Sequence, residues 1–192
     1  MSDVIKPHRD EALRRIGRNV VNFQRLEASL RQLVPSLSLA GPVRELGTLR
    51  ASRAKELKKK SLGELTNRLH AEVFRDEQEV LEPAIQTEIT FAHSFRIEAN
   101  STEVADNVKA LARLVRERNR LVHADLVSVD LNSITECEAL SDRLDEQNER
   151  ICAQLNFVNT LRQTHSTAVA ALVKFINSEE FLEQLKPDRD DA

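Results

Sequence analysis

Apolar residues recur at steps of three and four through most of this chain, a period that is typical of amphipathic α-helices. The first run predicts a helix over about residues 9–34, which Pro35 ends. The expected apolar face of this helix consists of Leu13, Ile16, Val20, Phe23, Leu26, Leu30 and Leu33. Glycines and a second proline follow, so we expect a loop over residues 35–60 that contains a short helical piece at about 43–58.

The middle of the chain has one clear helix start and one ambiguous segment. Ser61 and Glu64 form a capping box, which predicts a second helix that extends to about residue 80, before Pro83. Over residues 87–98 the alternation of Ile89, Phe91, Phe95 and Ile97 is typical of a half-buried strand, although a helical period also continues through part of this stretch. We favour a short β segment or hairpin near 88–98, because threonine and phenylalanine suit a pleated surface.

A long helix is predicted in the last third of the chain. From Ile134 to Phe175 apolar residues recur about every three and a half positions, which indicates packing along one seam. Asn148 and His165 interrupt this seam, and such residues usually set register or pair across an interface. We expect a break at 177–180, then a short terminal helix and an acidic tail. The expected organisation is one helical domain over 1–186 and a disordered tail over 187–192.

Composition agrees with a mainly α fold, because the 192 residues include only four glycines and five prolines. No apolar run reaches the length of a membrane span, and the amino terminus lacks the apolar core of a signal peptide, so we expect a cytoplasmic protein without a membrane partner. The two cysteines and five histidines show no metal-ligand spacing, and no glycine-rich phosphate loop is present. We therefore expect neither a metal nor a cofactor.

The charge distribution is uneven. A net charge of −3 argues against indiscriminate binding to nucleic acid. Residues 44–60 are nevertheless strongly basic, with two acidic residues, Glu45 and Glu56, among Arg44, Arg50, Arg53, Lys55, Lys58, Lys59 and Lys60. This segment fits a surface that meets phosphates, and it fits a solvated linker equally well.

Chemically reactive side chains gather at the end of a helix that we predict over residues 102–124, capped by Ser101 or Thr102. The expected apolar stripe of this helix consists of Leu111, Leu114, Val115 and Val122. Arg118 falls on the same stripe, where a charge must be paired or must line a wet cleft, because burying it alone is very costly.

Three residues of the stretch Arg116-Glu117-Arg118-Asn119-Arg120-Leu121-Val122-His123 suit phosphodiester chemistry. Arg118 can neutralise a phosphate, and His123 carries an imidazole, the side chain that most often moves protons in catalysis. Asn119 precedes His123 by four residues, roughly 40° around a helix, so it could orient the imidazole ring. We count all three as candidate catalytic residues, and Arg116 and Arg120 as candidate substrate-binding residues.

In this motif the chain resembles the HEPN superfamily, all-helical domains whose ribonuclease members carry an arginine, a polar residue and, after three to five further positions, a histidine near the end of a core helix. Arg118, Asn119 and His123 match that pattern. The resemblance implies an up-and-down helical bundle and a metal-independent endoribonuclease in which two protomers bring arginine and histidine into one shared cleft.

Such proteins include toxins and phage-defence effectors, so the resemblance also implies a homodimer, an RNA substrate and a cognate antitoxin or regulatory protein. One subgroup, paired with nucleotidyltransferases, has a tyrosine two places after the histidine. This chain has Asp125 there and contains no tyrosine, which argues against membership of that subgroup.

In the ribonuclease hypothesis, His123 exchanges a proton with the ribose 2′-hydroxyl or the leaving 5′-oxygen, and Arg118 stabilises the phosphorane-like transition state. A two-fold axis would supply the second histidine. Two alternatives stay open: a non-catalytic module of the same architecture that binds RNA, nucleotide or protein, and an unrelated scaffold whose long last helix is its binding surface. A purely structural alternative pairs Arg118 with a carboxylate such as Glu27 and makes His123 a helix cap.

Overall fold

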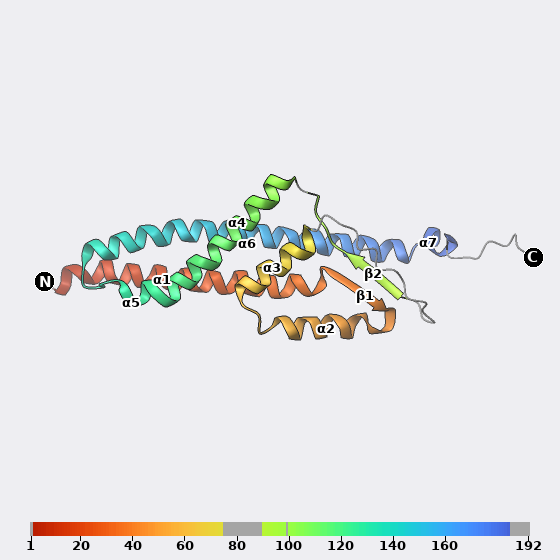
Figure 1. Cartoon of the computed structure of the whole chain (residues 1–192), viewed down its shortest axis with the longest axis horizontal. Coiled ribbons are helices and arrows are strands. Elements are labelled where there is room, and N and C mark those ends of the chain that lie inside the picture. Colours follow the sequence, from red (N-terminus) through yellow and green to blue (C-terminus); the bar gives the residue numbers. More distant parts are fainter. Residues whose placement is uncertain (1, 75–89, 99, 185–192) are drawn as a thin grey trace, which may run out of the picture. The chain divides into compact units, whose positions relative to one another are not determined.

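The computed structural model of the chain describes residues 2–74, 90–98 and 100–184. The described elements are, in order, α1 (Ser2–Leu33), η1 (Val34–Ser36), β1 (Ser38–Pro42), η2 (Val43–Glu45), α2 (Leu46–Leu57), α3 (Leu62–Val73), β2 (Thr90–Ser94), α4 (Ser101–Arg120), η3 (Leu121–Asp125), α5 (Leu126–Ser128), α6 (Ile134–Ile176) and α7 (Glu179–Gln184) (Figure 1). The mainly helical fold and the long C-terminal helix are confirmed. Helix α3 ends at Val73, with Phe74 as its C-cap, so the expectation that this helix extends to about residue 80 was wrong. The expectations about Pro83 and the acidic tail lie outside the described residues.

Contacts between residues group the chain into two units, Met1–Val158 and Asn159–Ala192, and the boundary falls inside α6. In the second unit the rings of Phe175 and Phe181 meet edge on, with centroids 5.2 Å apart, and this contact joins the end of α6 to α7. The predicted break near 177–180 is confirmed, since α6 ends at Ile176 and α7 begins at Glu179. Among the described residues no helix is both long and apolar enough to cross a bilayer.

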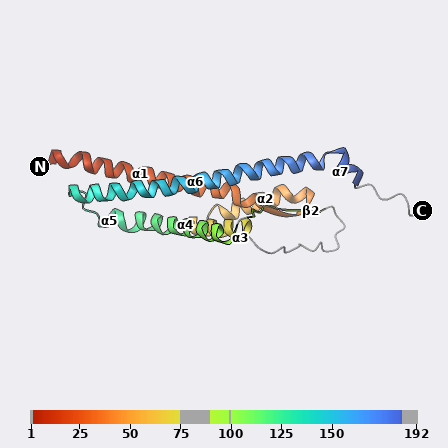
Figure 2. The ribbon, with the colours of Figure 1, turned by 90° about the horizontal axis from the view of Figure 1, so that it is seen from above.

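In the first unit, α1 lies beside the first part of α6, and the two helices run parallel (Figures 1 and 2). The numbers of the paired residues rise together, from His8 with Glu138 to Asn22 with Asn148. Helix α1 begins at Ser2 rather than near residue 9, and His8, within this added part, contacts Glu138 on α6. Most of the predicted apolar face is buried, namely Ile16, Phe23, Leu26, Leu30 and Leu33. Leu13 is the exception at 46% exposed, and Ala12 and Asn19 are buried as well.

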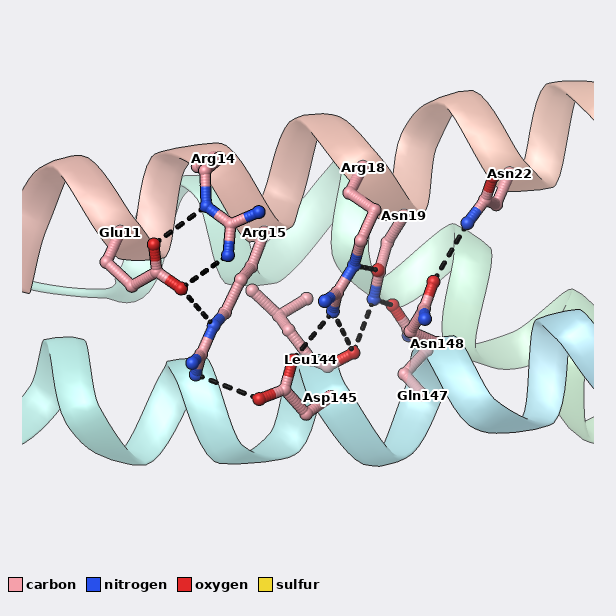
Figure 3. A network of polar contacts seen from close by, with 10 residues as sticks. All are labelled: Glu11, Arg14, Arg15, Arg18, Asn19, Asn22, Leu144, Asp145, Gln147 and Asn148. Carbon is pink, nitrogen blue, oxygen red and sulfur yellow. Dashed lines mark hydrogen bonds and ion pairs between the residues drawn. The ribbon is translucent and has the colours of Figure 1, made fainter.

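Polar side chains run along the contact between α1 and α6 (Figure 3). Nδ2 of Asn19 donates to the carbonyl oxygen of Leu144 over 2.7 Å and to Oε1 of Gln147 over 2.9 Å. Nη2 of Arg18 donates to the same carbonyl oxygen and to Oδ1 of Asp145. These buried groups therefore have hydrogen-bond partners, as buried amides require.

The small sheet pairs β1 with β2 in antiparallel register, with Ser38 opposite Ser94 and Pro42 opposite Thr90. The predicted β segment near 88–98 is confirmed by β2. Its partner is not a hairpin neighbour, because β1 comes from the segment that we expected to be a loop. The capping box of α3 is confirmed as well: Oγ of Ser61 accepts from the backbone N–H of Glu64, and the Glu64 carboxylate accepts from the backbone N–H of Ser61.

The buried side chains of α1, α3, α4 and α6 form the core of the first unit. Its largest contributors from these helices are Leu26, Leu30, Leu33, Leu65, Leu69, Leu111, Leu114, Leu140 and Ile151. Helix α3 contacts α4, and Nε2 of His70 lies 3.3 Å from Oδ1 of Asn107 across that contact. Helix α4 is thus packed against α3, and its carboxyl end carries the candidate motif.

Candidate functional site

The helix that carries the motif begins at a different cap from the one predicted. Oδ1 of Asn100 accepts a hydrogen bond from the backbone N–H of Glu103 over 2.9 Å, so Asn100 is the N-cap and Ser101 is the first helical residue. Asparagine is among the best N-caps because its side chain satisfies a free backbone donor of the first turn. The expectation that Ser101 or Thr102 caps this helix was therefore wrong by one or two positions.

At its carboxyl end, α4 passes directly into a π-helical turn over Leu121–Asp125. Leu121 is fully buried and continues the inner stripe of Leu111 and Leu114, whereas Val122, which we placed on that stripe, is 36% exposed. Single π-turns inserted in helices are rare and occur frequently at functional sites. His123 lies in this turn.

The π-turn also affects how Arg118 and His123 face one another. In a regular α-helix, residues five apart are separated by roughly 140° around the axis. The wider π-turn reduces that angle, so His123 lies closer to the face that carries Arg118 than the sequence alone would suggest. His123 is exposed, and Arg118 is partly buried.

A hydrogen bond joins Arg118 to Asn119. Nη1 of Arg118 donates a hydrogen bond to Oδ1 of Asn119 over 3.1 Å. No hydrogen bond joins Asn119 to His123 in the described part of the chain, so the amide contacts the guanidinium rather than the imidazole. The suggested partner Glu27 is engaged elsewhere, with Arg31 at 2.8 Å.

Arg116 and Arg120, the two predicted substrate-binding residues, differ in their surroundings. Nε of Arg120 donates to Oδ1 of Asp125 over 3.1 Å, and this ion pair spans the π-turn. Arg116 is exposed, and among the described side chains it has no acidic partner. Asp125, at the position of the subgroup's tyrosine, is thus an ion-pair partner of the motif.

Glu117 is the residue of this region whose role the sequence did not reveal. Its Oε1 lies 2.8 Å from Nε of Arg113 on the same helix and 3.0 Å from Nη2 of Arg150 on α6. The spacing of four between Arg113 and Glu117 is a local signal that the sequence contains. The ion pair with Arg150 has no such signal, because it depends on how α4 lies against α6.

The site as a whole is cationic. Glu117 and Asp125 are neutralised by the ion pairs described above, whereas Arg116 and Arg118 retain their charge. A surface of this kind attracts phosphate, and an exposed imidazole beside it can transfer a proton. One protomer supplies one imidazole here, so separate general acid and base would require a second copy.

Within residues 2–74, 90–98 and 100–184, no three or more histidine, cysteine or carboxylate side chains gather as a metal site would require. Comparison with protein-family models, curated proteins and solved structures finds no match to this chain.

Proposed function

We propose that this chain is a metal-independent endoribonuclease of the HEPN type, active as a homodimer in which Arg118 and His123 of both protomers line one cleft. The alternative that we weigh against it is a helical module that binds RNA without cutting it. The proposal is supported by the surroundings of Arg118, by the accessibility of His123 and by exposed apolar residues beside the histidine.

The observation that carries the proposal is that Arg118 lies on the inner stripe of α4 without a carboxylate partner among the described residues. Arg113 and Arg120, on the same stretch of chain, and Arg150 on α6 each form an ion pair. A partly buried arginine with a purely structural role would be expected to have such a partner, because desolvating a lone charge is costly. The charge of Arg118 is therefore available to an external anion such as a phosphate.

A second copy of the chain fits beside His123. Val122, which precedes His123 in the chain, is 36% exposed, and Val127, four residues after it, is 85% exposed. A two-fold axis near these valines would cover them and would bring the two histidines into one site. One imidazole would then act as general base while the other acts as general acid.

The proposed reaction is a transesterification. The ribose O2′ attacks the adjacent phosphorus and its proton passes to one His123, while the P–O5′ bond breaks and the O5′ takes a proton from the other His123. Arg118 stabilises the extra negative charge on the pentavalent phosphorane. Asn119, which accepts a hydrogen bond from Arg118, positions the guanidinium. The products are a 2′,3′-cyclic phosphate and a 5′-hydroxyl.

The test is cleavage of 5′-labelled RNA by the purified protein in EDTA, with analysis of the new ends. We expect cyclic phosphate ends from the wild type and a loss of about 10²- to 10⁴-fold in rate for Arg118→Ala and for His123→Ala, each folded as judged by circular dichroism. As a control, Arg143→Ala removes an exposed arginine of α6, outside the motif, and this variant should cleave RNA at the wild-type rate. Cleavage that survives in His123→Ala would overturn the proposal.

The dimer is tested separately, by sedimentation of Val127→Asp. Because Val127 is highly exposed, the substitution should leave the protomer folded while it separates the subunits and abolishes cleavage. Val21→Asp places the same charge at another exposed valine and should leave the dimer intact. A wild-type protein that binds RNA and never cuts it would instead support the non-catalytic module.

A further inference from the structure

Helix α2 carries much of the basic segment over residues 44–60, and one of its basic residues faces inward. Nη2 of Arg53 lies 2.5 Å from Oε1 of Glu72 on α3, and Nη1 of Arg53 donates to the carbonyl oxygen of Ser38 on β1. Leu57 is buried on the same side of the helix, and Leu49 lies against β1 at Gly41. These interactions fix which face of α2 points away from the protein.

Two further basic residues of the segment pair with nearby carboxylates. Nζ of Lys60 lies 2.9 Å from Oε1 of Glu64, and Nε of Arg44 lies 3.6 Å from Oε1 of Glu45. The remaining four, Arg50, Lys55, Lys58 and Lys59, are exposed and have no acidic partner among the described residues. We call these four residues the α2 cations.

Small residues surround the α2 cations. Gly47, Ala51, Ala54 and Lys58 follow one another at steps of four, three and four, and Lys55 is four residues after Ala51, so they share one face of α2 and of its C-cap. All of them are exposed, as are Thr48 and Ser52 beside them. The residues around the long cationic side chains therefore have short side chains, so a phosphate backbone can approach the helix closely.

We propose that the outer face of α2 binds the sugar–phosphate backbone of single-stranded RNA without reading its sequence. This inference rests on the proposed function for the identity of the polyanion, and on charge complementarity for the binding itself. The α2 cations supply four charges without an ion-pair partner among the described residues, Arg50 and Lys55 on α2 and Lys58 and Lys59 in the turn that follows it. The face has no aromatic side chain on which a base could stack and no large apolar side chain that could enter a membrane, so phosphates are the groups it fits best.

This surface is separate from the motif. In Figures 1 and 2 α2 lies toward the opposite end of the first unit from α5, which follows the motif directly in the chain. Phosphates bound at α2 should therefore hold a long RNA without taking part in bond cleavage. Removing the α2 cations should weaken affinity and leave the rate at saturating RNA unchanged.

The experiment measures binding of a fluorescent 2′-O-methyl RNA strand by anisotropy over a range of salt concentrations. This strand lacks the attacking hydroxyl, so binding is measured whether or not the protein is a nuclease. The test variant carries Arg50→Gln, Lys55→Gln, Lys58→Gln and Lys59→Gln together, since glutamine keeps a good helix propensity. The control carries Arg14→Gln, Lys109→Gln, Arg143→Gln and Lys174→Gln, which remove the same total charge at other exposed sites.

We expect the test variant to bind at least about tenfold more weakly near 0.1 M salt. Its plot of log affinity against log salt should be shallower by up to about 3, because each phosphate that a cation neutralises adds about 0.7 to the slope. The control should change both values much less. Equal weakening in the two variants, an unchanged salt slope, or no binding by the wild type would overturn the inference.

Two further outcomes distinguish this inference from a membrane-binding role of α2 and from the proposed nuclease activity. If the quadruple substitution weakens binding to vesicles of anionic lipid and leaves RNA binding unchanged, the α2 face binds a membrane and the inference fails. If the wild type binds and fails to cleave ordinary RNA, the proposed nuclease activity fails and the α2 surface stands.

Discussion

Nδ2 of Asn22 on α1 donates a hydrogen bond to Oδ1 of Asn148 on α6 over 2.8 Å. Asn19, about one turn earlier, makes two such bonds to the same helix. Buried amides that lose their partners destabilise the fold, so sliding one helix along the other would be costly. The expectation that Asn148 pairs across a seam is confirmed, and these amides set the parallel register of α1 and α6.

We predict that Asn19→Ala lowers the free energy of unfolding by about 1–3 kcal/mol, because Oε1 of Gln147 loses its buried donor. Urea denaturation followed by circular dichroism measures this change. Asn67→Ala, at an exposed position of α3, is the matched control and should change stability by less than about 0.5 kcal/mol. Similar losses in both variants would show that the amide network adds nothing specific.

Two glycines near α2 should respond oppositely to the same substitution. Gly41 has a φ of +154°, and an added Cβ would lie 2.7 Å from Cδ1 of Leu49. We therefore expect Gly41→Ala to destabilise the protein by about 1–3 kcal/mol. Gly47 lies inside α2 with no atom within 4 Å of the added Cβ, and Gly47→Ala should stabilise it by up to about 1 kcal/mol.

The comparison uses thermal or urea unfolding of the two variants beside the wild type. A Gly41→Ala protein as stable as the wild type would mean that β1 and Leu49 rearrange without cost. Since β1 supports α2, the same variant should also weaken RNA binding, whereas Gly47→Ala should not.

Stability should fall as the pH is lowered through the range in which histidine titrates. Burial lowers the pKa of His70, and a hydrogen bond with Asn107 opposes this only in part. Burial also lowers the pKa of His93, with the nearby Arg53 charge acting in the same direction and the Ser36 carbonyl opposing it. The unfolded chain takes up protons near the ordinary histidine pKa of 6.5, before the folded protein does.

It follows that the contribution of these neutral histidines is complete above about pH 6.5 and is lost as the pH falls toward and through their lower folded pKa values. We predict that His70→Gln combined with His93→Gln flattens the dependence of the unfolding free energy on pH between about 7 and about 5. Urea midpoints at several pH values measure the slope. A slope equal to that of the wild type would assign the acid sensitivity to other groups.

The structural features that could be predicted from the sequence are those that depend on residues close together in the chain. The period of apolar residues predicted α6, and the spacing of Ser61 and Glu64 predicted the start of α3, since both depend on hydrogen bonds and faces within one helix. The alternation around Phe91 predicted a strand on the same local grounds. The motif of Arg118 and His123 was likewise visible as a spacing at the end of a helix.

Interactions between distant segments were decided only by the folded chain. Nothing local to residues 38–42 indicated a strand, because β1 exists by pairing with β2, which lies about fifty residues later in the chain, beyond α2 and α3. Three further interactions likewise depend on partners far along the chain: the hydrogen bond of Asn19 with Gln147, the pairing of Arg53 with Glu72 and the ion pair of Glu117 with Arg150. Periodicity shows that a face is buried, whereas the identity of what covers it depends on the whole arrangement of helices. For the same reason, the sequence shows that Arg118 needs a partner, and the tertiary structure shows that the carboxylates around it are paired with other arginines.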